Sequence, residues 1–451
     1  MKRRVYIETY GCQMNVADSE VVLGILSQNG YVLTSEAEKA DLILVNTCSV
    51  RDHAEQRVLS RLGELRRIKK QNPGTLVGIL GCMAERLRSR LLHDHSIVDF
   101  VVGPDEYRKL PQLIEQASEG ERGIAVRLSR VETYDDIVPL RTDGISAWIA
   151  VMRGCDKFCS FCIVPFTRGR ERSRGLESII REVEMLSAQG FKEVTLLGQN
   201  VNSYRDGDHD FADLLAAVAS VDSSMRIRFM TSHPQDLSPK LIETIAARKN
   251  ICKYVHLPVQ SGSNRILQLM NRTYTREDYL RLVNMIRSII PGVGLSTDVI
   301  AGFPTETEFD HQMTLELLQE VRFDGAFMFK YSPREGTPAY RMGDDVPDEK
   351  KVQRLNEIIA VQKQISLEIN RTLIGTTEEI LVEGASKRSA AYLTGRTDAN
   401  KVVVFPRGDE KIGQYIQVTV RAATSATLLG ERLAEPSSQH QLRVHDSQNA
   451  I

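Results

Sequence analysis

The sequence predicts an α/β protein with an N-terminal α/β domain, a partial (βα)6 barrel of the TIM type and a small C-terminal β-barrel. Short apolar strands alternate with helices in the first hundred residues, and six further strand–helix units begin at Trp148. After residue 372 the pattern changes to short β-rich runs separated by turns. The expected domains are 1–125, 141–371 and 372–435, and the polar, unpatterned stretch 436–451 is expected to be a disordered tail.

Composition restricts the function classes that fit this chain. With 451 residues, 42% hydrophobic and 26% charged, it is typical of a soluble protein of two or three domains. No apolar run reaches the roughly eighteen residues of a membrane span, and the N-terminus lacks the apolar core of a secretion signal. We therefore expect a cytoplasmic protein without a membrane partner, in which clustered cysteines indicate metal binding or catalysis. The net charge of −1 means that any nucleic-acid site must be a local patch.

Three predicted strands of the N-terminal domain each end in a cysteine. "RVYIETYGC", "DLILVNTC" and "TLVGILGC" end at Cys12, Cys48 and Cys82, and each precedes a helical run, the last of which covers 83–95. Ligands of open α/β sheets bind at the carboxyl ends of the strands, so three thiols are expected at one sheet edge. A single free cysteine is commonly a buried small residue. Three cysteines at equivalent places in successive strand–helix units favour a ligand-binding site over three buried structural residues.

The central domain has strand patterns at 147–153, 193–198, 226–231, 253–259, 294–301 and 325–331. Six consecutive βα units predict a barrel or partial barrel whose reactive face lies at the strand carboxyl ends. Polar residues and a glycine at those ends are candidate cofactor contacts, although each also suits a turn or a cap: Gln199, Asn200, Ser232, Gln260, Ser261, Asp298 and Gly302.

The C-terminal segment follows a predicted helix at 348–370. Its runs "EEILVEG", "AAYLTGRT", "KVVVFPRG" and "YIQVTVRAAT" predict a small antiparallel barrel of the OB-like type, a class that often binds nucleic acid. Acidic and basic residues are nearly balanced there, so charge adds little support.

A cysteine triplet follows the first strand of the central domain. In "RGCDKFCSFC", Cys155, Cys159 and Cys162 are separated by three and then two residues, and the next histidine is His209. A structural zinc site is closed by four ligands and would need a distant one here. An iron–sulfur cluster with only three thiolates leaves one iron with an exchangeable position. The spacing favours a catalytic iron–sulfur cluster, with zinc as the alternative.

The Cys-x3-Cys-x2-Cys loop resembles that of radical S-adenosylmethionine enzymes. The resemblance implies a [4Fe–4S] cluster held by these three cysteines, S-adenosylmethionine on the free iron, and shielding by Phe158 and Phe161. "YGCQMN", "NTCSVRDHAE" and "GCMAE" are similar to motifs of one branch, the methylthiotransferases, which carry a C-terminal TRAM domain. In that branch Cys12, Cys48 and Cys82 would hold a second [4Fe–4S] cluster. Cys252 lies outside both triplets.

The resemblance also implies a reaction. "VPFTRGRERSR", "LLGQNVNSY", "TSHP", "VHLPVQSGS" and "IAGFPTET" are similar to methylthiotransferases that act on tRNA. These replace C2–H by C2–SCH3 in N6-isopentenyladenosine at position 37, next to the anticodon, and use two S-adenosylmethionine molecules per turnover. The implied partners are the tRNA anticodon stem-loop, an external electron donor and a sulfur source, and a monomer is expected.

Substrate contacts are predicted on two segments. Four arginines directly after the cysteine loop suit phosphate and base recognition, although a solvated loop is the simpler alternative: Arg168, Arg170, Arg172 and Arg174. On the TRAM-like segment, Tyr392, Lys401 and Phe405 are expected to contact the anticodon stem.

Two alternative functions stay open. A sister methylthiotransferase would act on threonylcarbamoyladenosine in tRNA or on an aspartate of a ribosomal protein. A more distant alternative is a non-catalytic RNA-binding protein that holds zinc.

Overall fold

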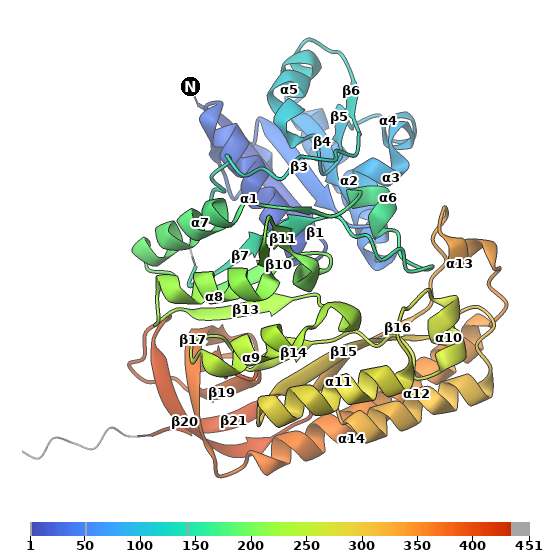
Figure 1. Ribbon diagram of the computed structural model, residues 1–451. Helices are drawn as coiled ribbons and strands as arrows, with labels where there is room; N and C mark the ends of the chain where they lie inside the picture. The colour runs from blue at the N-terminus through green and yellow to red at the C-terminus, as the bar shows by residue number, and fades with distance from the viewer. Residues whose placement is uncertain (1, 50–51, 142–143, 434–451) are drawn as a thin grey trace, which may run out of the picture. The chain divides into compact units, whose positions relative to one another are not determined.

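The computed structural model describes residues 2–49, 52–141 and 144–433. The chain forms two compact units, and the division between Ser366 and Leu367 falls within helix α14 (Asp348–Thr372). The first unit holds the N-terminal domain and the barrel domain (Figure 1). The barrel domain alone is called the core below. The predicted tail, 436–451, lies outside the described residues.

A six-stranded, all-parallel sheet forms the N-terminal domain, in the order β2-β1-β3-β4-β5-β6. Apart from one partly exposed residue at the start of β4, strands β3 and β4 are buried throughout, as expected of a parallel sheet covered on both faces. The three predicted strands are confirmed as neighbours. The short strands β2, β5 and β6, three residues each, were not predicted. The bounds are β1 Arg3–Tyr10, β2 Tyr31–Leu33, β3 Leu42–Thr47, β4 Leu76–Gly81, β5 Phe100–Val102 and β6 Gly123–Ala125.

Helices cover both faces of this sheet. Helices α1 (Gln13–Gln28) and α5 (Leu110–Ser118) share one apolar cluster with the sheet. On the other face, α2 (Asp52–Gln71) packs together with α3 (Cys82–Leu87) and α4 (Ser89–Asp94). The single helix predicted over 83–95 is therefore wrong. It breaks at Arg88, which has a φ of 51° and whose Nε donates to the Glu85 carbonyl oxygen at 3.0 Å, capping α3.

The core contains the six predicted strands, in two three-stranded parallel sheets, β13-β10-β7 and β14-β15-β16. A parallel bridge between Ile227 and Ile251 links the two sheets. No pairing joins β16 to β7 among the described strands, so the barrel is partial. The bounds are β7 Ser146–Ala150, β10 Glu193–Leu197, β13 Arg226–Met230, β14 Tyr254–His256, β15 Gly294–Ala301 and β16 Gly325–Lys330.

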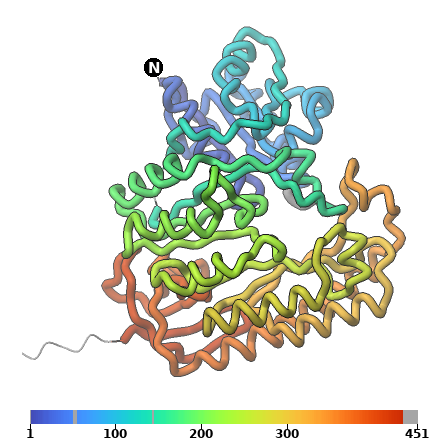
Figure 2. The backbone as a smooth tube through the Cα atoms, in the orientation of Figure 1, coloured from blue at the N-terminus to red at the C-terminus, as the bar shows by residue number. Residues whose placement is uncertain are grey.

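Helices between the strands cover the outside of the core, with α8, α9 and α11 in front of the strands in Figure 1. Several begin at capping boxes that satisfy their first N–H groups, such as Thr275 with Asp278. Figure 2 traces the chain from β6 of the N-terminal domain into the core. The bounds are α6 Val164–Arg168, α7 Leu176–Ala188, α8 Phe211–Val221, α9 Pro239–Ala247, α10 Asn264–Leu269, α11 Arg276–Ile289, α12 Glu308–Val321 and α13 Pro338–Arg341. Four short strands lie between them, β8 Met152–Arg153, β9 Arg172–Ser173, β11 Arg205–Asp206 and β12 His209–Asp210.

The second unit is a closed five-stranded barrel in the order β17-β18-β19-β21-β20, as predicted. Its bounds are β17 Thr377–Ser386, β18 Ser389–Arg396, β19 Val402–Pro406, β20 Tyr415–Ala423 and β21 Leu428–Arg432. Phe405 is fully buried in the barrel core, so its predicted contact with RNA is wrong. Tyr392 is exposed, and Lys401 Nζ donates to Asn370 Oδ1 at 2.8 Å. None of the described helices is long and apolar enough to span a membrane.

Candidate active site

The N-terminal cysteines lie at one edge of the sheet, as the strand pattern predicts. Strands β1, β3 and β4 are neighbours, and their register pairs Tyr10 with Thr47 and Thr47 with Gly81. Cys48 and Cys82 follow their strands directly, and Cys12 follows after Gly11. Three thiols from distant parts of the sequence therefore reach the same carboxyl edge.

Two buried asparagines shape this edge. Asn15 Oδ1 accepts from the Cys12 backbone N–H at 3.3 Å, and its Nδ2 donates to the Thr47 carbonyl oxygen at 3.1 Å. Asn46 Nδ2 donates to the Asn15 carbonyl oxygen at 2.8 Å. We did not predict either residue, although both stand within the cysteine motifs "GCQMN" and "NTC".

Gly81 allows the close approach of the strands before Cys82. Its φ is 90°, and a Cβ there would stand 2.4 Å from Asn46 Oδ1 and 2.5 Å from the Thr47 carbonyl oxygen. Only glycine fits both the conformation and the space.

The core cysteines lie on one loop closed by antiparallel pairing of β8 with β9. Gly154 begins this loop with a φ of 80°, and a Cβ there would meet the Arg170 carbonyl oxygen at 2.0 Å. Its N–H donates to Gln199 Oε1 at 2.5 Å, and the Cys155 N–H donates to the Gly169 carbonyl oxygen at 3.1 Å. Gln199, predicted as a cofactor contact, therefore holds the base of the loop.

The far side of the loop is anchored to the core. The Ser160 N–H donates to the Met270 carbonyl oxygen at 2.9 Å, and Phe161 packs against a buried apolar cluster. Phe158 is 40% exposed, and the Arg170 guanidinium lies 5.1 Å from the centre of its ring. Phe161 is thus partly buried beside the loop and Phe158 is exposed, and the shielding of a cluster by these two rings stays a prediction.

Arg272 is a site residue that sequence reasoning missed. Its Nη1 donates to Cys159 Sγ at 3.3 Å, its Nη2 to the Pro258 carbonyl oxygen at 2.8 Å and its Nε to Tyr274 Oη at 2.9 Å. Burial disfavours its charge, but Tyr274 and Cys159 raise the pKa of Arg272 above its usual value. A permanent cation therefore lies against one sulfur of the core triplet.

Burial raises the pKa of the Cys155 and Cys162 thiols to about 12. Such thiols stay protonated at neutral pH until a metal displaces the proton. No three His, Cys, Asp or Glu side chains of the described residues are arranged to hold a single metal ion. In an iron–sulfur cluster each thiolate binds a different iron, so its ligands do not converge on one point. The all-thiol donor set, with an arginine against one sulfur, fits such a cluster.

Two predicted cofactor contacts have buried polar atoms without a hydrogen-bond partner among the described residues. They are Asn200 Oδ1, after β10, and Ser232 Oγ, after β13. Asn200 is oriented by its Nδ2, which donates to Asp236 Oδ2 at 2.7 Å. A buried acceptor and a buried hydroxyl at two strand ends suit a polar ligand.

The other predicted contacts have mixed positions. Asp298 is partly exposed, with Oδ1 3.4 Å from His256 Nε2, and the Gln260 N–H donates to the Asp298 carbonyl oxygen at 2.8 Å. Ser261 Oγ accepts from the Ser263 N–H at 3.2 Å, and the Gly302 N–H donates to Glu306 Oε1 at 3.0 Å. These internal bonds give Ser261 and Gly302 structural roles, and their contact with a cofactor stays a prediction.

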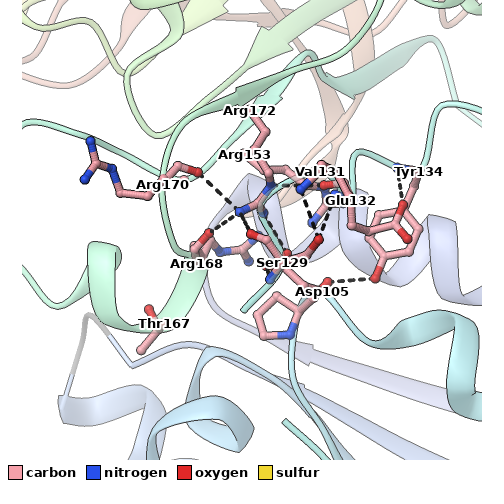
Figure 3. Close-up of polar contacts among 12 residues, drawn as sticks. Asp105, Ser129, Val131, Glu132, Tyr134, Arg153, Thr167, Arg168, Arg170 and Arg172 are labelled. Atoms are coloured by element: carbon pink, nitrogen blue, oxygen red, sulfur yellow. Dashed lines mark hydrogen bonds and ion pairs between the residues drawn. The ribbon is translucent and has the colours of Figure 1, made fainter. Parts of the chain in front are cut away.

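The four arginines do not form the exposed run that we expected. Arg168, Arg172 and Arg174 are buried. Arg172 donates to Asp105 Oδ1 at 2.8 Å and to four carbonyl oxygens, and Arg174 donates to Glu182 Oε2 at 2.7 Å. Arg170 points away from this cluster in Figure 3, is 64% exposed at its side chain and pairs with Asp156. Of the four arginines, Arg170 alone is exposed, and its contact with RNA stays a prediction.

Asp18 joins the two cysteine sites. It is fully buried, and its carboxylate lies 2.8 Å from Arg153 Nη1 and 2.6 Å from Arg168 Nη2. Arg153 stands two residues before Cys155, while Arg168 Nε donates to Cys82 Sγ at 3.2 Å. Beside them, Met14 and Ala17 of α1 pack against the last residues of β7 and β10. The cysteine edge of one domain therefore faces the strand ends of the other.

The sequence matches three family models. Residues 4–103 match "Uncharacterized protein family UPF0004", residues 149–318 match the "Radical SAM superfamily" and residues 371–433 match the "TRAM domain". The middle match contains the core cysteine loop, and this superfamily implies a [4Fe–4S] cluster and S-adenosylmethionine.

Solved structures show the same fold at low identity. The radical S-adenosylmethionine methyltransferase TsrM from Kitasatospora setae aligns with a TM-score of 0.57 and 17% identity, over 84% of this chain and 77% of that one. The cobalamin-dependent S-adenosylmethionine radical enzyme OxsB aligns with a TM-score of 0.53 and 12% identity, over 79% and 56%.

Much closer relatives carry one name, tRNA-2-methylthio-N(6)-dimethylallyladenosine synthase. Those of Chloroherpeton thalassium and Bacteroides thetaiotaomicron are 55% and 54% identical, over 96% of this chain and of each relative. That of Porphyromonas gingivalis is 52% identical, over 97% of this chain and 96% of its own. This chain therefore belongs to the tRNA-2-methylthio-N(6)-dimethylallyladenosine synthase family of radical S-adenosylmethionine enzymes.

Proposed function

We propose that this protein converts N6-isopentenyladenosine at position 37 of tRNA into its 2-methylthio derivative, replacing C2–H by C2–SCH3. The full-length identity to synthases of that name supports the substrate. The observation that carries the proposal is the pair of cysteine triplets on facing edges, joined through Asp18. An enzyme that both generates a radical and inserts sulfur needs two such sites within reach of one substrate atom.

Cys155, Cys159 and Cys162 would hold one [4Fe–4S] cluster and Cys12, Cys48 and Cys82 the second. When bound, the clusters and two S-adenosylmethionine molecules per turnover supply the radical and methylthio chemistry that a carbon without an acidic proton requires. The residues of the chain would hold the cluster loop and orient the cofactor. Gln199 and Arg272 hold the core loop, and the buried Asn200 Oδ1 and Ser232 Oγ are the candidate cofactor contacts.

Recognition of tRNA would use the exposed groups. Arg170 above the Phe158 ring presents a cation and an aromatic face beside the core loop, a pair suited to phosphate and base contact. Tyr392, exposed on the TRAM barrel, would stack on the anticodon stem-loop. The reaction also needs an external electron donor and a sulfur source, and we expect a cytoplasmic monomer.

The test is anaerobic reconstitution followed by single-substrate assays. Two clusters require about eight iron and eight sulfide per chain. The enzyme is then given tRNA carrying isopentenyladenosine, tRNA carrying threonylcarbamoyladenosine, or ribosomal protein, and products are read by mass spectrometry. We expect methylthiolation of the first only. Product on protein alone, or zinc in place of iron and sulfide, would refute the proposal.

Single cysteine variants separate the two sites. Cys155→Ala is expected to abolish cleavage of S-adenosylmethionine, whereas Cys48→Ala retains cleavage without thiolation. Cys252→Ala, buried but outside both triplets, is the matched control and retains both activities. Methylthiolation by both site variants would overturn the assigned roles.

A further inference from the structure

Arg168 reaches from the core to a sulfur of the N-terminal triplet. It ends helix α6, which packs against α3, the helix that Cys82 begins. Its Nε donates to Cys82 Sγ at 3.2 Å, and both residues are at most 4% exposed. The environment of Cys82 is therefore built partly by the other domain.

The position of Arg168 is fixed by Asp18. The Arg168 Nη2 donates to Asp18 Oδ2 at 2.6 Å, and Arg153 lies 2.8 Å from the other carboxylate oxygen. Two guanidinium groups and one carboxylate leave one net positive charge beside Cys82. In addition, Arg168 Nη1 is buried without a hydrogen-bond partner among the described residues, so one donor remains for an acceptor that the polypeptide does not supply.

A purely structural ion pair would not need the sulfur. Arg172, four residues further along, shows that case, because it is equally buried and pairs with Asp105 at 2.8 Å. Its other acceptors are carbonyl oxygens, as Figure 3 shows. What distinguishes Arg168 from its neighbour is the bond to a cysteine sulfur.

We propose that Arg168 is a positioning residue for the second cluster, which orients the Cys82 sulfur and raises the reduction potential of the cluster held by Cys12, Cys48 and Cys82. Reduction adds one electron, and the extra negative charge spreads onto the sulfur ligands. A buried cation that donates to one sulfur stabilises the reduced form more than the oxidised form. The inference rests on the proposed function, because it requires that this triplet holds a cluster.

The experiment isolates the second cluster in the full-length chain. Cys155, Cys159 and Cys162 are replaced by alanine, the chain is reconstituted anaerobically, and about four iron and four sulfide per chain are expected. The midpoint potential is measured by electron paramagnetic resonance during stepwise reduction with dithionite, the external electron source. In this background, Arg168→Gln is expected to make reduction about tenfold less favourable, which equals about 59 mV for one electron.

Two further variants change the charge in known directions. Asp18→Asn leaves both arginines without their counter-charge, so the potential is expected to rise. Arg168→Lys keeps the charge but loses the forked geometry, and a smaller fall than that of Arg168→Gln is expected. The control combines Arg172→Gln with Asp105→Asn, which removes an equally buried ion pair that has no sulfur contact and does not change the net charge, so the potential should stay unchanged.

The outcomes separate the two proposals. If the parent chain binds no iron and sulfide, the second cluster of the proposed function is refuted. If the cluster forms and Arg168→Gln leaves its potential unchanged, the role of Arg168 is refuted. A shift of the same sign in Arg168→Gln, in Asp18→Asn and in the control that combines Arg172→Gln with Asp105→Asn would mean general damage and also overturn the inference. If the Arg168→Gln variant does not form the cluster, its potential cannot be measured, and the Asp18→Asn variant decides. A potential that does not rise in Asp18→Asn then refutes the role of Arg168.

Discussion

Replacement of Arg172 by methionine should destabilise the first unit strongly. Arg172 donates to Asp105 and to the carbonyl oxygens of Ser129, Glu132, Arg168 and Arg170. Methionine fills a similar volume but leaves the Asp105 carboxylate buried, with only the Ser129 N–H at 2.9 Å. Loss of one partner of a buried ion pair costs about 3–5 kcal/mol, against a total stability of about 5–15 kcal/mol for a typical domain.

The loss of stability caused by Arg172→Met should grow as the pH rises. Burial already raises the pKa of Asp105 above its usual value, although Arg172 opposes this. Without Arg172 the folded-state pKa rises further, so the carboxyl avoids its unpaired charge by staying protonated. A raised carboxyl pKa gives stability that is present below the unfolded pKa and is lost as pH rises through the folded pKa. The free energy of unfolding that Arg172→Met loses relative to the unmutated chain is therefore smaller near pH 5 than near pH 8.

Urea unfolding followed by tryptophan fluorescence measures this directly, because Trp148, the only tryptophan, lies in β7 of the first unit. The double variant Arg172→Met with Asp105→Asn removes the charge and should recover much of the loss near pH 8, with little pH dependence. A deficit below about 1 kcal/mol, or one equal at both pH values, would refute the reasoning.

Three further outcomes are expected. Gly154→Ala places a Cβ 2.0 Å from the Arg170 carbonyl oxygen at a φ of 80°, so iron should fall from about eight to about four per chain; Gly190→Ala, also at positive φ but with nothing within 4 Å, should keep all of it. Arg272→Met removes the donor to Cys159 Sγ and should slow cleavage of S-adenosylmethionine about tenfold or more at unchanged iron content. Burial raises the pKa of Glu20 to about 7 against the opposing effect of Arg141, so its contribution to stability is lost as pH rises from 4.5 through 7, and Glu20→Gln should flatten thermal melting in that window.

Each of these has a clear contrary result. Equal iron in the Gly154 and Gly190 variants would show that the loop tolerates the added Cβ. Unchanged cleavage in Arg272→Met would remove any role for that guanidinium at the sulfur. If the melting temperature of Glu20→Gln depends on pH in the same way as that of the unmutated chain, the Glu20 carboxyl is already ionised in the folded state.

The positions of the six cysteines in the fold were predictable because the sequence signal for them is local. A cysteine directly after an apolar strand is visible in one short segment, and parallel strand order then brings Cys12, Cys48 and Cys82 to a common edge. The core triplet is still more compact, since Cys155 and Cys162 lie on one loop. The barrel strands were predicted for the same reason, from their apolar runs.

Arg168 and Arg172 were misread because their partners are distant in the sequence. Asp18 lies 150 residues from Arg168, and Asp105 lies 67 residues from Arg172. A basic run without visible counter-charges is normally placed on the surface, and no periodic pattern shows that a carboxylate from another domain will neutralise it. Arg272 was missed likewise, because its sulfur acceptor is 113 residues away.

The different origins of the two triplets affect how the holoprotein assembles. The ligands from Cys155 to Cys162 close one short loop, whereas those from Cys12 to Cys82 close a segment about nine times longer. Closing the longer segment before the sheet has formed costs about 2 kcal/mol more in chain entropy. If both triplets hold clusters as proposed, the core loop would be the easier place for iron to nucleate. The N-terminal edge would accept the proposed second cluster only after β1, β3 and β4 have aligned. Slow folding of that sheet would therefore leave the second site without its cluster.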